Sequence, residues 1–102
     1  MKKDFLAITD YSSEELQQML DRAVAIKTAW KVEGYSDALK DKSLAMVFQK
    51  PSLRTRVSFE RGMEQLGGDA LYLSPMEIGL GKRESIADVA RVLSGYVDGI
   101  MA

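Results

Sequence analysis

Cationic and hydroxyl side chains crowd the segment QKPSLRTRVSFERG (residues 49–62), which directly follows the apolar run LAMVF. Its first half brings together Lys50, Ser52, Arg54, Thr55 and Arg56. Serine and threonine hydroxyls are short hydrogen-bond donors, and a guanidinium donates two parallel N–H bonds to an oxyanion without losing its charge. Residues of these types at this spacing predict a site for a phosphate-sized anion.

The helix expected after this turn supports the prediction. A helix N-terminus carries about half a positive charge, so a cation in the first turn costs about 0.3–1 kcal/mol. Arg54 and Arg56 are therefore unfavourable there unless an anion binds to them, to the helix dipole and to the free backbone N–H groups. Pro51 favours an extended Lys50, and we expect the turn at the carboxyl end of a strand, where open α/β sheets bind ligands. Ser52 could also serve as an N-cap, a role compatible with phosphate binding.

Some of the cations have ordinary structural alternatives. Arg56 precedes Glu60 by four positions, so a surface ion pair along the helix is an alternative to anion binding. Arg61 with Glu64 is typical of a solvated helix face. Arg54 has no acidic residue within four positions, so the anion hypothesis is strongest there.

The composition is that of one small globular domain or part of one. The chain has 102 residues, 46% hydrophobic and 28% charged, and no apolar run approaches the ~18 residues of a membrane helix. The net charge of -1 argues against general attraction to nucleic acid or membrane surfaces, so any anion binding must be local. The absence of Cys and His removes disulfides, the usual zinc sites and histidine catalysis from these residues. We read no signal peptide and expect a cytoplasmic protein.

The pattern of apolar residues predicts an α/β fold: an N-terminal helix followed by βαβαβ, an open parallel sheet with helices on both faces. The first helix is expected to begin at a capping box formed by Ser12 and Glu15 and to end near Gly34.

The strands are predicted from short apolar runs that do not alternate, as is typical of parallel strands covered on both faces. These runs are residues 43–48, 69–73 and 98–102. Helices are expected between them, from about Arg54 to Leu66 and from Ser85 onward.

A second basic segment, GLGKRES (residues 79–85), precedes the last expected helix. Neither G-x-x-x-x-G-K-[ST] nor a G-x-G-x-x-G that follows a strand is present, so a P-loop and a dinucleotide site are not predicted. The segment is either a surface loop or a lid whose Lys82 or Arg83 reaches an anionic ligand.

FQKPSLRTRVSFE resembles the carbamoyl phosphate signature of the aspartate and ornithine carbamoyltransferases, S-x-R-T-R followed by S-F-E. GKRESIADVARVLSGYVDGIMA is similar to the same family's loop and following helix, and GMEQLGGDALYL between them is also family-like. The resemblance covers essentially the whole chain. It implies that residues 1–102 are part of a carbamoyl-phosphate-binding domain without the amino-acid-binding second domain, from a trimeric enzyme that needs no metal or organic cofactor.

The resemblance also implies roles for individual residues. Arg54 would act as a catalytic residue by stabilising the charge on the leaving phosphate while a neutral amine attacks the carbamoyl carbon. Arg56 and Lys82 are candidates for further contacts. The implied phosphate contacts are Ser52, the backbone of Leu53, Arg54, Thr55 and Arg83.

Several positions bear on which member of the family the chain resembles. Lys50 before Pro51 looks more like the ornithine branch, which converts carbamoyl phosphate and L-ornithine to L-citrulline and phosphate, and relatives that use aspartate, acetylornithine or putrescine stay open. Leu53 replaces the usual Thr or Met, and Gly79 stands where ornithine enzymes often have a Gln that reaches a neighbouring subunit. The family has an Arg directly after the third strand, where this chain ends with Ala102, and a His-Pro helix start beyond it. We therefore expect an enzyme fragment that is inactive alone and self-associates through exposed strand edges.

A non-catalytic anion-binding or folding module is the alternative from another class. A small nucleic-acid binder is disfavoured by the net charge and by the lack of aromatic residues among the cations. The expected partners are carbamoyl phosphate, an amino-acid amine in the full-length enzyme only, and further copies of the chain.

Overall fold

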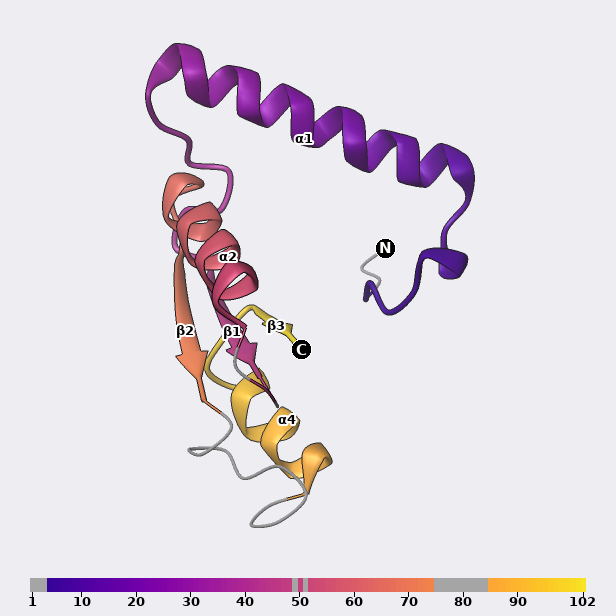
Figure 1. The fold of residues 1–102 in the computed structure, drawn as a ribbon, viewed down its shortest axis with the longest axis vertical. Helices are drawn as coiled ribbons and strands as arrows, with labels where there is room; N and C mark the ends of the chain where they lie inside the picture. The colour runs from indigo at the N-terminus through magenta and orange to yellow at the C-terminus, as the bar shows by residue number, and fades with distance from the viewer. Residues whose placement is uncertain (1–3, 49, 51, 75–84) are drawn as a thin grey trace. The chain divides into compact units, whose positions relative to one another are not determined.

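The computed structural model describes residues 4–48, 50, 52–74 and 85–102, which fall into two compact units that divide after Gly34. The first unit contains a 3-10 helix, Ile8–Asp10, and α1, Ser13–Glu33. The second contains a parallel sheet and its helices, shown in Figure 1: β1 (Ser43–Val47), α2 (Leu53–Gln65), β2 (Asp69–Leu73), α4 (Ile86–Ser94) and β3 (Gly99–Met101). This is the predicted α/β element order.

Helix α1 begins and ends where its local sequence requires. The Ser12 hydroxyl accepts a hydrogen bond from the Glu15 N–H at 3.1 Å, and the Glu15 carboxylate accepts one from the Ser12 N–H at 2.9 Å. At the other end Gly34 adopts a left-handed conformation (φ 80°), and its N–H donates to the Trp30 carbonyl. The predicted capping box and glycine stop are both confirmed, because each depends on neighbouring residues only.

The sheet has the order β2-β1-β3, with both pairs parallel. Ala45 of β1 lies between Leu71 of β2 and Ile100 of β3. The central strand supplies most of the core, since the four consecutive residues 45–48 are all buried. The edge strands differ from the expectation of cover on both faces: Leu71 is 50% exposed and Ile100 40% exposed. An apolar run therefore indicated a strand correctly but overestimated its burial at the sheet edges.

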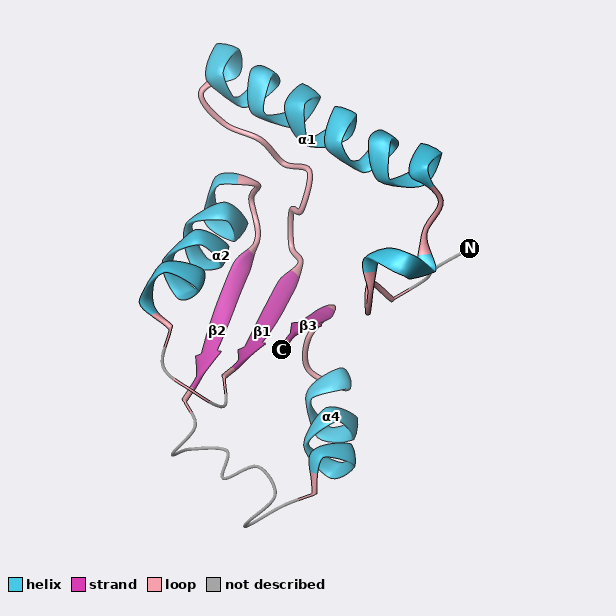
Figure 2. Cartoon of the chain, turned by 45° about the vertical axis from the view of Figure 1, so that its right-hand side comes forward, coloured by secondary structure: helices cyan, strands magenta, loops and turns pink. Residues whose placement is uncertain are grey.

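Helix α2 lies between β1 and β2 in the sequence, and α4 lies between β2 and β3. Since β2 and β3 flank β1 on opposite edges, the first crossover runs toward one edge of the sheet and the second runs toward the other. Because such crossovers are right-handed, α2 and α4 belong on opposite faces of the sheet. Helix α2 packs on β2 and β1, and Met63 is its buried residue. In Figure 2 the arrowheads of β1 and β2 point to the end of the sheet where α2 and α4 begin.

Close backbone contacts fix the return from α2 into β2. A Cβ atom on Gly68 would lie 2.7 Å from the carbonyl oxygen of Lys42 and 2.9 Å from that of Leu39. Gly67 adopts φ 90°, which a residue with a side chain rarely does. The pair of glycines therefore both ends α2 and lets the chain pass against the segment that enters β1.

Asp98 attaches the last strand to the first. Its carboxylate accepts a hydrogen bond from the Ser43 N–H at 2.9 Å, and its own N–H donates to the Ser43 carbonyl at 3.0 Å.

Within the described ranges, no helix combines the length and the apolar character needed to cross a membrane.

Candidate functional site

The candidate site is the turn between β1 and α2, at the carboxyl end of the central strand. Ser52 is the N-cap residue of α2, and the Arg56 N–H donates to the Ser52 carbonyl at 3.0 Å. The preceding three N–H groups, of Leu53, Arg54 and Thr55, have no carbonyl acceptor inside the helix. They point out of the helix N-terminus, where the dipole favours an anion.

Serine occupies the N-cap of the described helices α1, α2 and α4 but caps only α1 and α4 through its side chain. In α1 and α4 the hydroxyls of Ser12 and Ser85 accept hydrogen bonds from the N–H three residues on. Both residues have similar backbone angles, with φ -74° and ψ 163° for Ser12 and φ -71° and ψ 151° for Ser85. Ser52 has φ -148° and ψ 96°, and its hydroxyl makes no such bond. The first turn of α2 also lacks an acidic residue, so its N–H groups and hydroxyl are available to a ligand.

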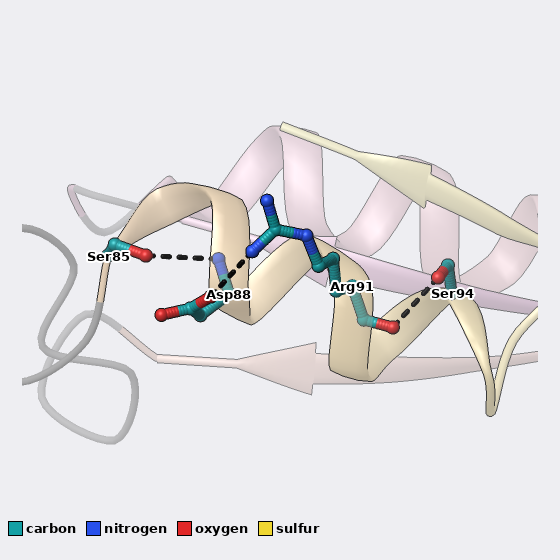
Figure 3. Close-up of polar contacts among 4 residues, drawn as sticks. All are labelled: Ser85, Asp88, Arg91 and Ser94. Carbon is teal, nitrogen blue, oxygen red and sulfur yellow. Dashed lines mark hydrogen bonds and ion pairs between the residues drawn. The ribbon is translucent and has the colours of Figure 1, made fainter.

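Figure 3 shows the contrasting arrangement on α4. The Ser85 hydroxyl accepts from the Asp88 N–H at 3.1 Å, and the Asp88 carboxylate pairs with Arg91 at 2.7 Å. The Ser94 hydroxyl donates to the Arg91 carbonyl at 2.8 Å. The side chains of α4 therefore satisfy its own first turn and place a carboxylate there. An anion would bind the N-terminus of α4 much less favourably than that of α2.

The two arginines of the turn have different surroundings. Arg54 is exposed, whereas Arg56 is half-buried with its guanidinium 3.9 Å from the centroid of the Tyr72 ring. Among the described residues Arg56 makes no ion pair with Glu60, so that alternative is wrong. A cation–π contact of about 0.5–2 kcal/mol offsets the cost of a cation near the helix start.

Most of the other predicted site residues can also be placed. Ser52 and Thr55 are half-buried, and Leu53 is 75% exposed. Arg61 pairs with Glu64 at 3.3 Å on an exposed helix face, as the solvated-face interpretation requires. Lys50 is exposed. Four further positions named from the sequence lie outside the described residues: Pro51, Gly79, Lys82 and Arg83.

Sequence reasoning did not single out Tyr72. Its ring lies under the Arg56 guanidinium and tilts against Phe48, with 5.5 Å between ring centroids. An aromatic residue within an apolar strand carries no local signal of such a contact.

In the described part of the chain no three acidic side chains come together as a metal site would require.

Comparison with known proteins agrees with the geometry of the turn. The family model described as aspartate/ornithine carbamoyltransferase, carbamoyl-P binding domain, matches residues 3–102. The chain belongs to this carbamoyltransferase family.

Ornithine carbamoyltransferase of Anoxybacillus flavithermus is 54% identical over 99 residues, covering 97% of this chain and 32% of its own length. The solved structure of ornithine carbamoyltransferase from Pyrococcus furiosus matches 98% of the chain at 51% identity with a TM-score of 0.90. The catalytic subunit of M. jannaschii aspartate transcarbamoylase matches 97% at 36% identity with a TM-score of 0.87. The chain thus spans about a third of the length of these carbamoyltransferases.

Proposed function

We propose that this chain is part of the carbamoyl-phosphate-binding domain of an ornithine carbamoyltransferase. The observation that carries the proposal is the open N-terminus of α2, with the exposed Arg54 beside it, at the carboxyl end of the central strand. A dianionic phosphate group suits this position because the first turn of α2 has no acidic residue and carries free N–H groups, two hydroxyls and a guanidinium.

In this proposal the turn binds the phosphate and assists its departure. Ser52, Thr55 and the backbone N–H of Leu53 donate to phosphate oxygens, and Arg54 adds a charge-assisted hydrogen bond. The nitrogen of a neutral amine attacks the carbonyl carbon, the bond from that carbon to the phosphate oxygen breaks, and phosphate leaves with the electron pair. The attacking nitrogen then loses a proton. Arg54 and the helix dipole stabilise the charge that grows on the leaving oxygen.

The choice of ornithine rests on similarity. The Anoxybacillus ornithine enzyme is 54% identical and the M. jannaschii aspartate enzyme 36% identical over nearly the same residues. The sequence preference drawn from Lys50 points the same way. We place the site for the amine, and the groups that polarise the carbonyl, in the part of the relatives' length that residues 1–102 do not span. Trimeric assembly and a cytoplasmic location belong to the same proposal and rest on the family resemblance.

The test is turnover by the intact gene product with carbamoyl phosphate and, in turn, ornithine, acetylornithine, putrescine and aspartate. We expect citrulline from ornithine and little product from the others. A parallel sample of residues 1–102 alone should bind phosphate without turnover. Preference for another amine would reassign the branch, and the absence of carbamoyl phosphate binding would refute the proposed function as a whole.

A further inference from the structure

Three side chains stack beside the phosphate-binding turn, and we call them the Arg56–Tyr72–Phe48 stack. The Arg56 guanidinium carbon lies 3.9 Å from the Tyr72 ring centroid. The Tyr72 ring lies 5.5 Å from that of Phe48, at an interplanar angle of 47°. The three residues come from the first turns of α2, from β2 and from the position directly after β1. The stack therefore joins the start of the helix to the carboxyl ends of two strands.

The register of the sheet explains why these side chains meet. Tyr72 pairs with Met46 of β1, and Phe48 lies two positions after Met46 in the sequence. The side chains of Tyr72, Met46 and Phe48 therefore project from the same face of the sheet. Phe48 is 8% exposed, and its N–H donates to the Leu73 carbonyl at 3.4 Å, which continues the contact between the strands beyond their last paired residues. Tyr72 and Arg56 are half-buried, and partial removal from water strengthens a cation–π contact.

The backbone of the turn is linked directly to this stack. Arg56 provides the first N–H that is bonded inside α2, to the Ser52 carbonyl, so it closes the turn that presents the free N–H groups. Residues two apart on a helix point about 200° apart. With Arg56 directed at the sheet, Arg54 points away from it, where the helix start is open to a ligand.

We propose that Tyr72 is a positioning residue that acts through Arg56 to hold the first turn of α2 in its phosphate-binding geometry. This role rests on the proposed function of the turn. In this role Arg56, the second arginine of the S-x-R-T-R motif, contacts the Tyr72 ring and does not bind the phosphate.

The test is a double-mutant cycle on binding of inorganic phosphate and of carbamoyl phosphate, measured by calorimetry on the intact gene product. Tyr72→Leu and Arg56→Met should each weaken binding roughly threefold to tenfold, the range expected for loss of one cation–π contact. The double variant should be no weaker than either single variant, because both remove the same contact. Tyr72→Phe keeps a ring and should bind like the unmodified protein. Tyr96→Leu, which removes a ring that is 80% exposed, is the matched control.

Two results would overturn the role of Tyr72. One is normal anion affinity in Tyr72→Leu. The other is a loss in Arg56→Met that is much larger and adds fully to that of Tyr72→Leu, as a direct phosphate ligand would give. Should Tyr72→Leu fail to fold, the size of the loss in Arg56→Met still decides: a loss of threefold to tenfold supports the inference, and a much larger one, typical of a direct phosphate ligand, overturns it. Failure of the unmodified protein to bind either anion would refute the proposed function, whereas normal binding by both Tyr72→Leu and Arg56→Met would refute this inference alone.

The stack also has a signature that needs no ligand. Protons on the Arg56 side chain lie over an aromatic face, so their NMR signals should be shifted upfield by the ring current and return to ordinary positions in Tyr72→Leu. Unshifted signals in the unmodified protein would show that the stack does not form in solution.

Discussion

Replacing Arg54 with methionine should change stability and binding in opposite directions. Methionine and arginine have similar helix propensities, so the substitution removes mainly the charge and its hydrogen bonds. Without ligand, loss of an exposed cation from a first turn with no acidic residue should raise the free energy of unfolding by about 0.3–1 kcal/mol. Loss of one hydrogen bond to a charged group, worth about 1.5–3 kcal/mol, should weaken binding of carbamoyl phosphate about tenfold to 150-fold.

These two effects predict that the order of stability reverses with ligand. At a carbamoyl phosphate concentration of about 100 times its dissociation constant, the unmodified protein gains about 2.7 kcal/mol. At the same concentration the Arg54→Met variant gains only about 0.3–1.4 kcal/mol. The unmodified protein should thus be the less stable of the two without ligand and the more stable with it.

The assay is urea denaturation of the intact gene product with and without ligand, together with calorimetric titration. Arg61→Met is the matched control, because Arg61 is exposed on the same helix and pairs with Glu64 at 3.3 Å. It should leave affinity unchanged and lower stability by no more than about 0.5 kcal/mol. An Arg54→Met variant that is less stable without ligand, or that binds carbamoyl phosphate normally, would refute the reasoning.

Three further predictions concern the elements that hold the site. Ser85→Ala should destabilise its helix by about 1 kcal/mol in thermal unfolding, whereas Ser52→Ala should weaken phosphate binding with little loss of stability; equal destabilisation would contradict the difference in capping. Gly68→Ala should lower the free energy of unfolding in urea by about 1–3 kcal/mol, because the new methyl group meets backbone carbonyls, and Gly62→Ala, which meets nothing within 4 Å, should instead be stabilising. Asp98→Ala should lower stability by about 0.5–1.5 kcal/mol and speed hydrogen exchange of the amide it accepts from, and unchanged exchange would count against that bond.

The sequence predicted what local physics determines. The ends of α1 follow from a capping box and a glycine. The start of α4 follows from Ser85, the N-cap residue, whose hydroxyl accepts from the Asp88 N–H. The strands were found from apolar composition, with bounds that differ by one residue at Phe48, Asp98 and Ala102. The cationic turn was also visible, because cations at a helix start break a local preference.

The sequence could not reveal what depends on distant partners. The order β2-β1-β3 follows from pairing between residues more than twenty positions apart, and the exposure of the edge strands follows from that order. The guanidinium of Arg56 contacts Tyr72, which is distant in the sequence. Helical spacing alone would instead have paired Arg56 with Glu60, four residues on. The open cap at Ser52 is a matter of backbone angles, which the identity of the residue does not determine.

The place of β1 at the centre of the sheet has a consequence for synthesis on the ribosome. Both strands that pair with β1 follow it along the chain, and Met101 is made 54 positions after Val47. At about 5–20 residues per second, translation takes roughly 3–11 s to cover that distance. Throughout this interval β1, whose residues 45–47 are buried in the folded sheet, lacks at least one of its two pairing strands, so chaperones have their best opportunity to bind it then.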